Sequence, residues 1–161
     1  DYFTCFHLVM KRVAKIFNTL FGIGFLPYAP GTIASVFTVL LWYFFIQFFS
    51  IYTFVIFILL VIVLSIYLVN LHLTEHSSDD PSEIVIDEFI GQSLPLMFLS
   101  QNSELFEILF AFICFRIFDI YKIYPVNIGE KMKGAIGVIA DDVIAGIYTV
   151  IFLMVYRIIL Y

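Results

Sequence analysis

The sequence predicts an all-α integral membrane protein, a bundle of about five hydrophobic helices preceded by an amphipathic N-terminal segment. Hydrophobic residues make up 63% of the 161 residues, only 13% are charged, and the mean hydropathy is +1.06. A soluble domain of this length cannot bury so much apolar side chain, whereas a bilayer removes that limit. The segment 31–74 also contains no Asp, Glu, Lys or Arg. We expect a single domain over residues 1–161.

The chain before this uncharged segment is amphipathic and then irregular. Residues 1–16 mix Lys11, Arg12 and Lys15 with apolar residues. This pattern predicts a short helix lying on the membrane surface. Residues 21–32 hold two prolines and three glycines, which predicts an irregular loop.

The uncharged segment must fold back on itself. As one straight helix it would span roughly 65 Å, against about 30 Å for the hydrocarbon core of a bilayer. Gln47 to Ser50 is the expected reversal. The segment therefore predicts helices near 32–47 and 51–73.

The rest of the chain alternates polar and apolar segments. We expect a loop at 75–83, an apolar segment at 84–99, a helix at 104–121, a loop at 124–134 and a last helix from Ile136 to the end. The segment 84–99 is short and is broken by Pro95, so it either spans the membrane or only dips into it.

Two helical hairpins would bring the ionisable residues to one membrane face. The first hairpin returns the chain to its starting side, where 79–88 then lies. The second returns 116–122 to that side, and Asp141 and Asp142 open the last helix there. Most basic residues fall on this face and Arg157 falls opposite, so the positive-inside rule makes the converging face cytoplasmic.

Several carboxylates at one face favour a bound divalent cation, because the cation offsets their repulsion. Oxygen ligands prefer Mg²⁺, Mn²⁺ or Ca²⁺. Arg116, Asp119 and Lys122 share roughly one helical face, so the two cations could bind a phosphate. The loop that leads to Gly31 and Thr32 is typical of a phosphate cradle at a helix N-terminus. Together these groups predict metal-assisted phosphoryl hydrolysis.

Structural roles and another function class compete with this interpretation. Paired acids at a helix start can be caps, and Arg116 with Asp119 can be a structural ion pair. His72 and His76 are spaced as ligands but lack a partner motif. A small ion carrier could instead use the acids as a cation path, and acids on the face opposite to the cluster would favour it. The net charge of −5 argues against nucleic acid, and protein partners stay open.

The motifs, in their order, resemble the phosphatidylglycerophosphatase A family. The matching pieces cover most of 21–149: the loop 22–32, Asp80-Pro81 with 84–91, 115–122 with Pro125, and 134–146. The resemblance implies a multi-pass enzyme of the bacterial inner membrane whose active site faces the cytoplasm. It implies Mg²⁺-dependent removal of the terminal phosphate of phosphatidylglycerophosphate, a phospholipid substrate, to give phosphatidylglycerol.

The resemblance also assigns candidate site residues, and their individual roles are our hypothesis. The expected metal ligands are Asp80, Asp87, Glu88, Asp141 and Asp142. The expected phosphate-binding residues are Gly31, Thr32, Arg116 and Lys122. The expected catalytic residues are Asp119, Asp142, Arg116 and Lys122, with Asp119 as a ligand or the general base. Direct attack by water is expected, and a covalent aspartyl-phosphate route stays open.

Overall fold

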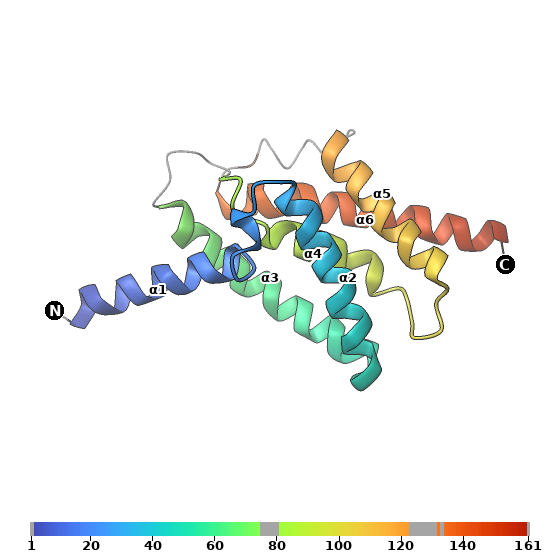
Figure 1. Ribbon diagram of the computed structural model, residues 1–161, viewed down its shortest axis with the longest axis horizontal. Helices are drawn as coiled ribbons and strands as arrows, with labels where there is room; N and C mark the ends of the chain where they lie inside the picture. Colours follow the sequence, from blue (N-terminus) through green and yellow to red (C-terminus); the bar gives the residue numbers. More distant parts are fainter. Residues whose placement is uncertain (1, 75–80, 123–131, 133, 161) are drawn as a thin grey trace.

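The computed structural model describes residues 2–74, 81–122, 132 and 134–160 (Figure 1). These residues form six α-helices and one short 3-10 helix: α1 (Tyr2–Asn18), η1 (Ile23–Phe25), α2 (Pro30–Phe48), α3 (Ile51–Leu73), α4 (Ile86–Leu96), α5 (Leu105–Tyr121) and α6 (Ala135–Leu160). No β-strand occurs in this part of the chain. The predicted all-α class is confirmed.

Three helices are long and apolar enough to cross a membrane, namely Pro30–Phe48, Ile51–Leu73 and Ala135–Ile159. α4 and α5 have only 11 and 17 residues. At about 1.5 Å per residue they reach roughly 17 and 26 Å, short of a hydrocarbon core of about 30 Å. The sequence predicted about five hydrophobic helices, and three of these qualify as candidate spans.

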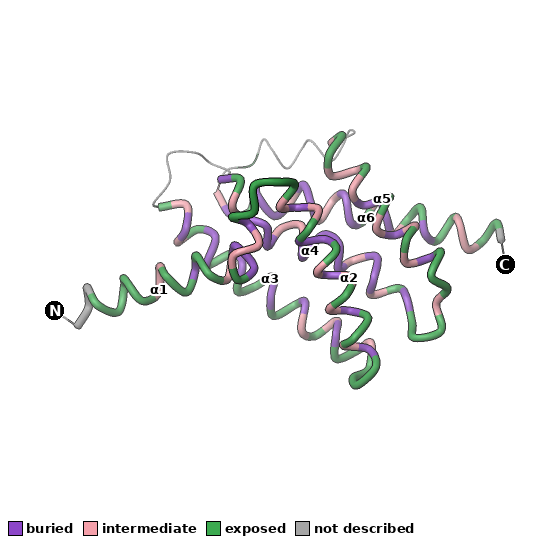
Figure 2. The backbone as a smooth tube through the Cα atoms, viewed as in Figure 1, coloured by how far each residue is buried: buried purple, intermediate pink, exposed green. Residues whose placement is uncertain are grey.

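α4 is a buried helix at the centre of the molecule rather than a span (Figure 2). Its buried residues are Ile86, Phe89, Ile90, Gly91, Gln92, Ser93, Pro95 and Leu96. A β-carbon on Gly146 would lie 2.5 Å from the Gly91 carbonyl oxygen, so α4 and α6 pack backbone against backbone. Small residues permit such close helix contacts in membrane proteins.

The two chain reversals meet at one end of the bundle. Ser50 caps α3 by accepting a hydrogen bond from the Thr53 amide at 3.3 Å. The side chain of Gln101, in the turn between α4 and α5, donates to the Ile46 carbonyl near the end of α2. Arg157 of α6 reaches this end too, donating to the Phe98 carbonyl at 2.9 Å.

The opposite end gathers the other helix termini. The amide of Ala135, which begins α6, donates to the Asn70 side chain of α3 at 3.1 Å. The Val85 amide, just before α4, donates to the Asn18 carbonyl at the end of α1 at 2.9 Å. Both hairpins therefore return to one end, as the sequence predicted.

The outer surface of the three candidate spans is apolar. Phe48, Val63 and Ile158 are 81%, 70% and 81% exposed. Water would hydrate such a surface at a high cost, whereas lipid tails contact it freely. The protein is a membrane protein, and its polar cluster lies at one end of these spans.

Candidate active site

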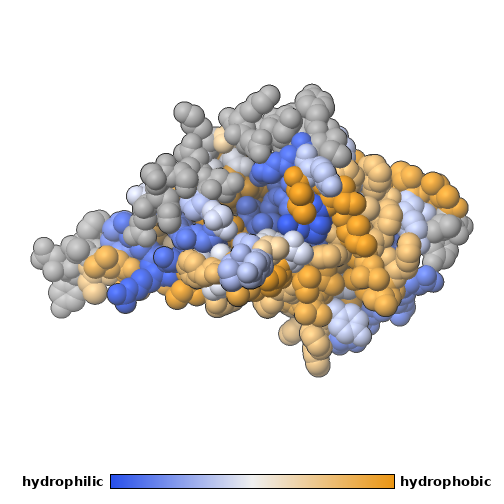
Figure 3. Space-filling model, turned by 45° about the horizontal axis from the view of Figure 1, so that its top comes forward, coloured by the Kyte–Doolittle hydropathy of each residue, from blue (hydrophilic) through white to orange (hydrophobic). Residues whose placement is uncertain are grey.

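A cleft of about 430 Å³ opens at the end of the bundle where α2, α4 and α6 begin and α5 ends. Figure 3 shows hydrophilic atoms gathered in a recess near the middle of the molecule, with hydrophobic atoms beside it. The ionisable residues that line the cleft are Asp87, Glu88, Arg116, Asp119, Lys122, Asp141 and Asp142. Segments far apart in sequence, from residue 29 to residue 142, thus supply one polar site.

Three carboxylates form the tightest group in the cleft. One oxygen from each of Asp87, Glu88 and Asp142 lies within 4.8 Å of the other two. Asp87 and Glu88 occupy the first turn of α4, and Asp142 lies in α6. A β-carbon on Gly91 would lie only 2.6 Å from the Asp142 carbonyl oxygen, so the close helix contact brings these acids together.

The N-terminus of α2 closes one wall of the cleft. Gly31 is buried there, and a β-carbon at this position would overlap Oε1 of Glu88. Gly31 and Thr32 lie in the first turn, where helix amides have no intrahelical acceptor. This end of a helix carries partial positive charge and binds anions.

Two cations face the acids, and each pairs with a carboxylate. Arg116 Nη1 lies 2.5 Å from Oδ2 of Asp119 and 3.4 Å from the Ser35 hydroxyl on α2. Lys122 Nζ lies 2.8 Å from Oδ2 of Asp141. Lys122 ends α5 in the left-handed region, with φ of 43°, so the backbone turns as its side chain reaches α6.

The cleft holds an excess of negative charge. Among the described residues that line it, five carboxylates outnumber two cations by three. Burial, with the negative charge of Asp119 adding to it, raises the pKa of Glu88 to about 7, although Asp87 and Arg116 act in the opposite direction. An anionic phosphate would be repelled by these carboxylates unless a bound cation lowered the negative charge of the cleft.

The donor set fits a hard divalent cation. All three members of the tight group offer carboxylate oxygens, which Mg²⁺ and Ca²⁺ prefer. Oε2 of Glu88 is buried and has no hydrogen-bond partner among the described residues. A buried, unsatisfied carboxylate oxygen is costly, and coordination to a cation would satisfy it.

The sequence-predicted residues converge as expected. Every one of them within the described residues lines the cleft: Gly31, Thr32, Asp87, Glu88, Arg116, Asp119, Lys122, Asp141 and Asp142. Asp80 lies outside the described residues. Asp141 contacts Lys122 and is not in the tight group, so its role as a metal ligand stays a prediction.

Sequence reasoning missed Ser35 and a buried network beside the cleft. Ser35 lies one helical turn after Gly31, and that spacing was the available signal. His72 Nε2 lies 3.0 Å from Glu83 Oε1, and its Nδ1 lies 3.3 Å from the side-chain nitrogen Nδ2 of Asn18. His72 therefore ties α3 to the segment that leads into α4, and His76 lies outside the described residues.

Two acids also lie at the opposite end of the bundle. Glu104 and Glu107 form a capping box at the start of α5, and Glu107 Oε1 lies 2.6 Å from Arg157 Nε. From the sequence we expected Arg157 at this end of the bundle, and we did not name these two acids. Glu107 and Asp119 lie on the same helix, about 18 Å apart along its axis. Both acids have structural partners, and neither lines the cleft.

Comparisons with known proteins show which relatives this chain resembles. The family model described as phosphatidylglycerophosphatase A matches residues 16–157. A Bacteroides thetaiotaomicron protein named "Putative phosphatidylinositol-3-phosphatase" is 35% identical over 155 residues, covering 92% of this chain and 98% of the relative. Proteins named phosphatidylglycerophosphatase A are 31% identical in Escherichia coli, covering 79% of this chain and 73% of the relative, and 36% identical in Haemophilus influenzae, covering 81% and 80%. No solved structure matches.

Proposed function

The chain belongs to the phosphatidylglycerophosphatase A family of lipid phosphatases, and we propose that it hydrolyses the terminal phosphomonoester of phosphatidylglycerophosphate. The products are phosphatidylglycerol and inorganic phosphate. One observation carries the proposal: a carboxylate triad, two cations and a helix N-terminus line one cleft at the end of the candidate spans.

Asp87, Glu88 and Asp142 would hold a divalent cation, for which we propose Mg²⁺. When bound, such a cation polarises a phosphoryl oxygen and lowers the charge that the phosphate meets. α4 supplies Asp87 and Glu88 and α6 supplies Asp142, so neither helix alone carries all three carboxylates. The protein's contribution is to keep these oxygens converged before substrate arrives.

Arg116 and Lys122 would bind the phosphate of the substrate. Arg116 is fixed by Asp119 and Ser35, and Lys122 is fixed by Asp141. Cations fixed in this way lose little conformational freedom when they bind an anion. The first-turn amides of Gly31 and Thr32 add donors from the opposite wall.

Asp119 is our candidate for the general base, with a role as metal ligand as the alternative. Its carboxylate lies in the cleft beside Arg116, at the end of α5. In direct hydrolysis a water oxygen forms the new bond to phosphorus and the bond to the leaving oxygen breaks. Asp119 would accept a proton from that water, and a proton then reaches the leaving alcohol.

The position of the cleft suits a lipid substrate. It lies at the ends of α2 and α6, whose apolar outer surfaces would contact lipid tails. A headgroup could enter the cleft while its acyl chains stay in the bilayer. We propose that this face is cytoplasmic, in the inner membrane of a bacterium, because basic residues of the sequence gather on it.

Hydrolysis of phosphatidylinositol-3-phosphate is the second candidate. The relative from Bacteroides thetaiotaomicron carries that activity in its name and matches nearly its whole length. Both lipids present a phosphomonoester on a polyol headgroup, so the same charged groups could serve either reaction. Headgroup size and hydroxyl pattern would then decide the substrate.

An ion carrier is less well supported. Acids on the face opposite to the cluster were expected to favour it, and Glu104 and Glu107 lie there. A carrier also needs acids along a route through the bilayer, and these two acids are engaged in a cap and an ion pair. α6 carries no acid between Asp142 and its C-terminal end at Leu160. Flux of Mg²⁺ or Na⁺ into liposomes without phosphatase activity would favour the carrier.

The test is phosphate release by the purified chain in detergent. Phosphatidylglycerophosphate and phosphatidylinositol-3-phosphate are supplied separately, each with Mg²⁺ and with a chelator. We expect Mg²⁺-dependent release from the first lipid, at least tenfold faster than from the second. Asp142→Asn should abolish release, and Glu104→Gln, a matched carboxylate-to-amide change at the far end, should retain it. Folded protein that releases phosphate from neither lipid contradicts the proposal.

A further inference from the structure

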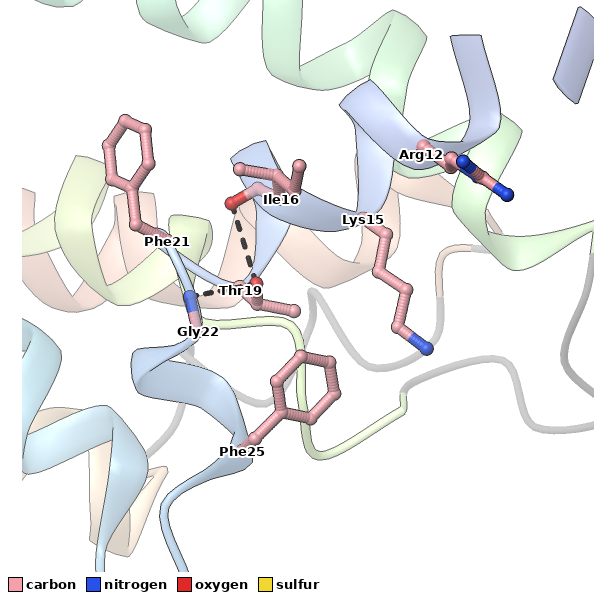
Figure 4. Close-up of a pocket in the computed structure, with 7 residues that line it drawn as sticks. All are labelled: Arg12, Lys15, Ile16, Thr19, Phe21, Gly22 and Phe25. Carbon is pink, nitrogen blue, oxygen red and sulfur yellow. Dashed lines mark hydrogen bonds between the residues drawn. The ribbon is translucent and has the colours of Figure 1, made fainter. Parts of the chain in front are cut away.

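A second cavity, of about 480 Å³, lies where α1 meets the loop that leads to α2. Its lining combines apolar groups, among them Ile16, Phe21 and Phe25, with the cations Arg12 and Lys15. In Figure 4 the Lys15 side chain extends from α1 toward the loop that carries Phe25, and Nζ lies 5.1 Å from the centre of that ring. The cavity shares no lining residue with the acidic cleft.

A strained turn builds the loop side of this cavity. Leu20 and Phe21 adopt left-handed backbone angles, with φ of 46° and 57°, and Gly22 follows with φ of 101°. The Gly22 amide donates to the Thr19 hydroxyl at 3.2 Å, which holds the turn (Figure 4). Bulky residues rarely adopt such angles without a compensating function. The turn leaves the Phe21 ring 82% exposed.

The outer side of α1 has the pattern of a helix that lies in a membrane interface. Phe6, Val9, Val13 and Ile16 are exposed and form one stripe at helical spacing. Arg12 and Lys15 both lie on one side of that stripe. Such helices bury an apolar stripe among acyl chains and keep their cations at the level of the lipid phosphates.

The start of α2 indicates where the cavity lies relative to the bilayer. α2, the first candidate span, begins at Pro30, five residues after Phe25. Tyr28 lies between them and is 83% exposed. Aromatic residues gather at the membrane–water boundary, so we expect the cavity to lie at that boundary.

We propose that this cavity binds one anionic phospholipid of the bilayer, at a site separate from the acidic cleft. Arg12 and Lys15 contact the phosphodiester, and the acyl chains lie along Ile16, Phe21 and Phe25. The charges decide the class of lipid: the described residues that line the cavity include two cations and no acid. A zwitterionic lipid gains less there, because its own cation is repelled. The site would hold the enzyme beside the anionic lipids among which its proposed substrate and product occur.

The test measures lipid binding, not hydrolysis. The purified full chain in detergent is titrated with dioleoylphosphatidylglycerol or dioleoylphosphatidylcholine, and bound lipids are counted by native mass spectrometry. Neither lipid has a phosphomonoester, so neither is consumed. We expect the wild type to prefer phosphatidylglycerol, and the Arg12→Gln/Lys15→Gln double variant to bind it roughly tenfold more weakly. Phosphatidylcholine binding should not change.

Two matched variants locate the site. Lys11→Gln removes a cation from the same helix outside the cavity lining, and Lys122→Gln removes one from the acidic cleft. Both should keep the preference for phosphatidylglycerol. Loss in Lys122→Gln alone would assign the bound lipid to the cleft and overturn the proposal. A folded double variant that binds phosphatidylglycerol as tightly as the wild type would also overturn it. So would a dimer that forms with every protein except the double variant, because the two cations would then act at a protein interface.

Discussion

Gly31 lies directly against the Glu88 carboxylate, so close that a β-carbon on Gly31 would overlap Oε1. The contact joins the first turn of α2 to the first turn of α4. Any side chain at position 31 must therefore displace Glu88, whose Oε2 is buried without a hydrogen-bond partner among the described residues. Position 31 requires glycine because the Glu88 carboxylate leaves no room for a side chain, and not because of its backbone angle.

Gly31→Ala should remove activity while leaving the fold intact. The overlapping atom is the end of a flexible side chain, so Glu88 can move and the helix need not. Alanine also favours the helix more than glycine does. We expect phosphate release to fall about 100-fold, since misplacing a catalytic group by ~1 Å can cost that much. A thermal melt near that of the wild type is the control, and wild-type activity would contradict the assignment of Glu88.

Gly91→Ala should instead destabilise the protein. Its β-carbon would lie 2.6 Å from the Asp142 carbonyl oxygen and 2.6 Å from the Phe115 ring, inside the contact between α4, α5 and α6. Backbone cannot yield as a carboxylate can, and overpacking costs about 1–3 kcal/mol. Thermal denaturation in detergent should show a lower Tm than for Gly31→Ala. An unchanged Tm would mean that α4 and α6 leave room for a β-carbon at position 91.

The sequence predicted the long helices well because their composition is uniform. Helices expected near 32–47 and 51–73 are found at Pro30–Phe48 and Ile51–Leu73. The reversal expected at Gln47 to Ser50 is also found, and Ser50 caps α3 there. The family resemblance is likewise confirmed, because it depended on motifs in order rather than on packing.

The central helix and the ion pairs between different helices could not be predicted. α4 looks like a possible span in the sequence, and only its packing against α6 and α2 shows that it is buried. The partner of Lys122 is Asp141 because the end of α5 lies beside α6. Glu107 pairs with Arg157 across fifty positions of sequence for the same reason. Such pairs depend on how helices pack, which no local pattern records.

Mg²⁺ should stabilise the folded protein through the triad. A ligand that binds only the folded state raises Tm. At one hundred times its Kd it adds about 2.7 kcal/mol to the free energy of unfolding. We expect a Mg²⁺-dependent rise in Tm for the wild type and little rise for Asp142→Asn or Glu88→Gln. Without metal these variants should melt no lower than the wild type, because each removes a carboxylate from a repulsive group. Equal stabilisation of all three proteins would place the cation elsewhere.

The ion pair at the far end should give the fold an acid-sensitive contribution. Glu107 lies in the first turn of α5, outside the three candidate spans, and the hydrogen bond from Arg157 holds its pKa below the usual range. A carboxylate with a lowered folded pKa binds its proton more tightly when unfolded, so its stabilisation is complete above the unfolded pKa and is lost as pH falls through the folded pKa. Denaturation of Glu107→Gln should therefore depend less on pH below about 4.3, the ordinary glutamate value. The activity of this variant per folded molecule at neutral pH should match that of the wild type, because Glu107 and Arg157 do not line the cleft. A variant as acid-sensitive as the wild type would show that the pair contributes nothing, and a loss of activity without unfolding would link the far end to the reaction.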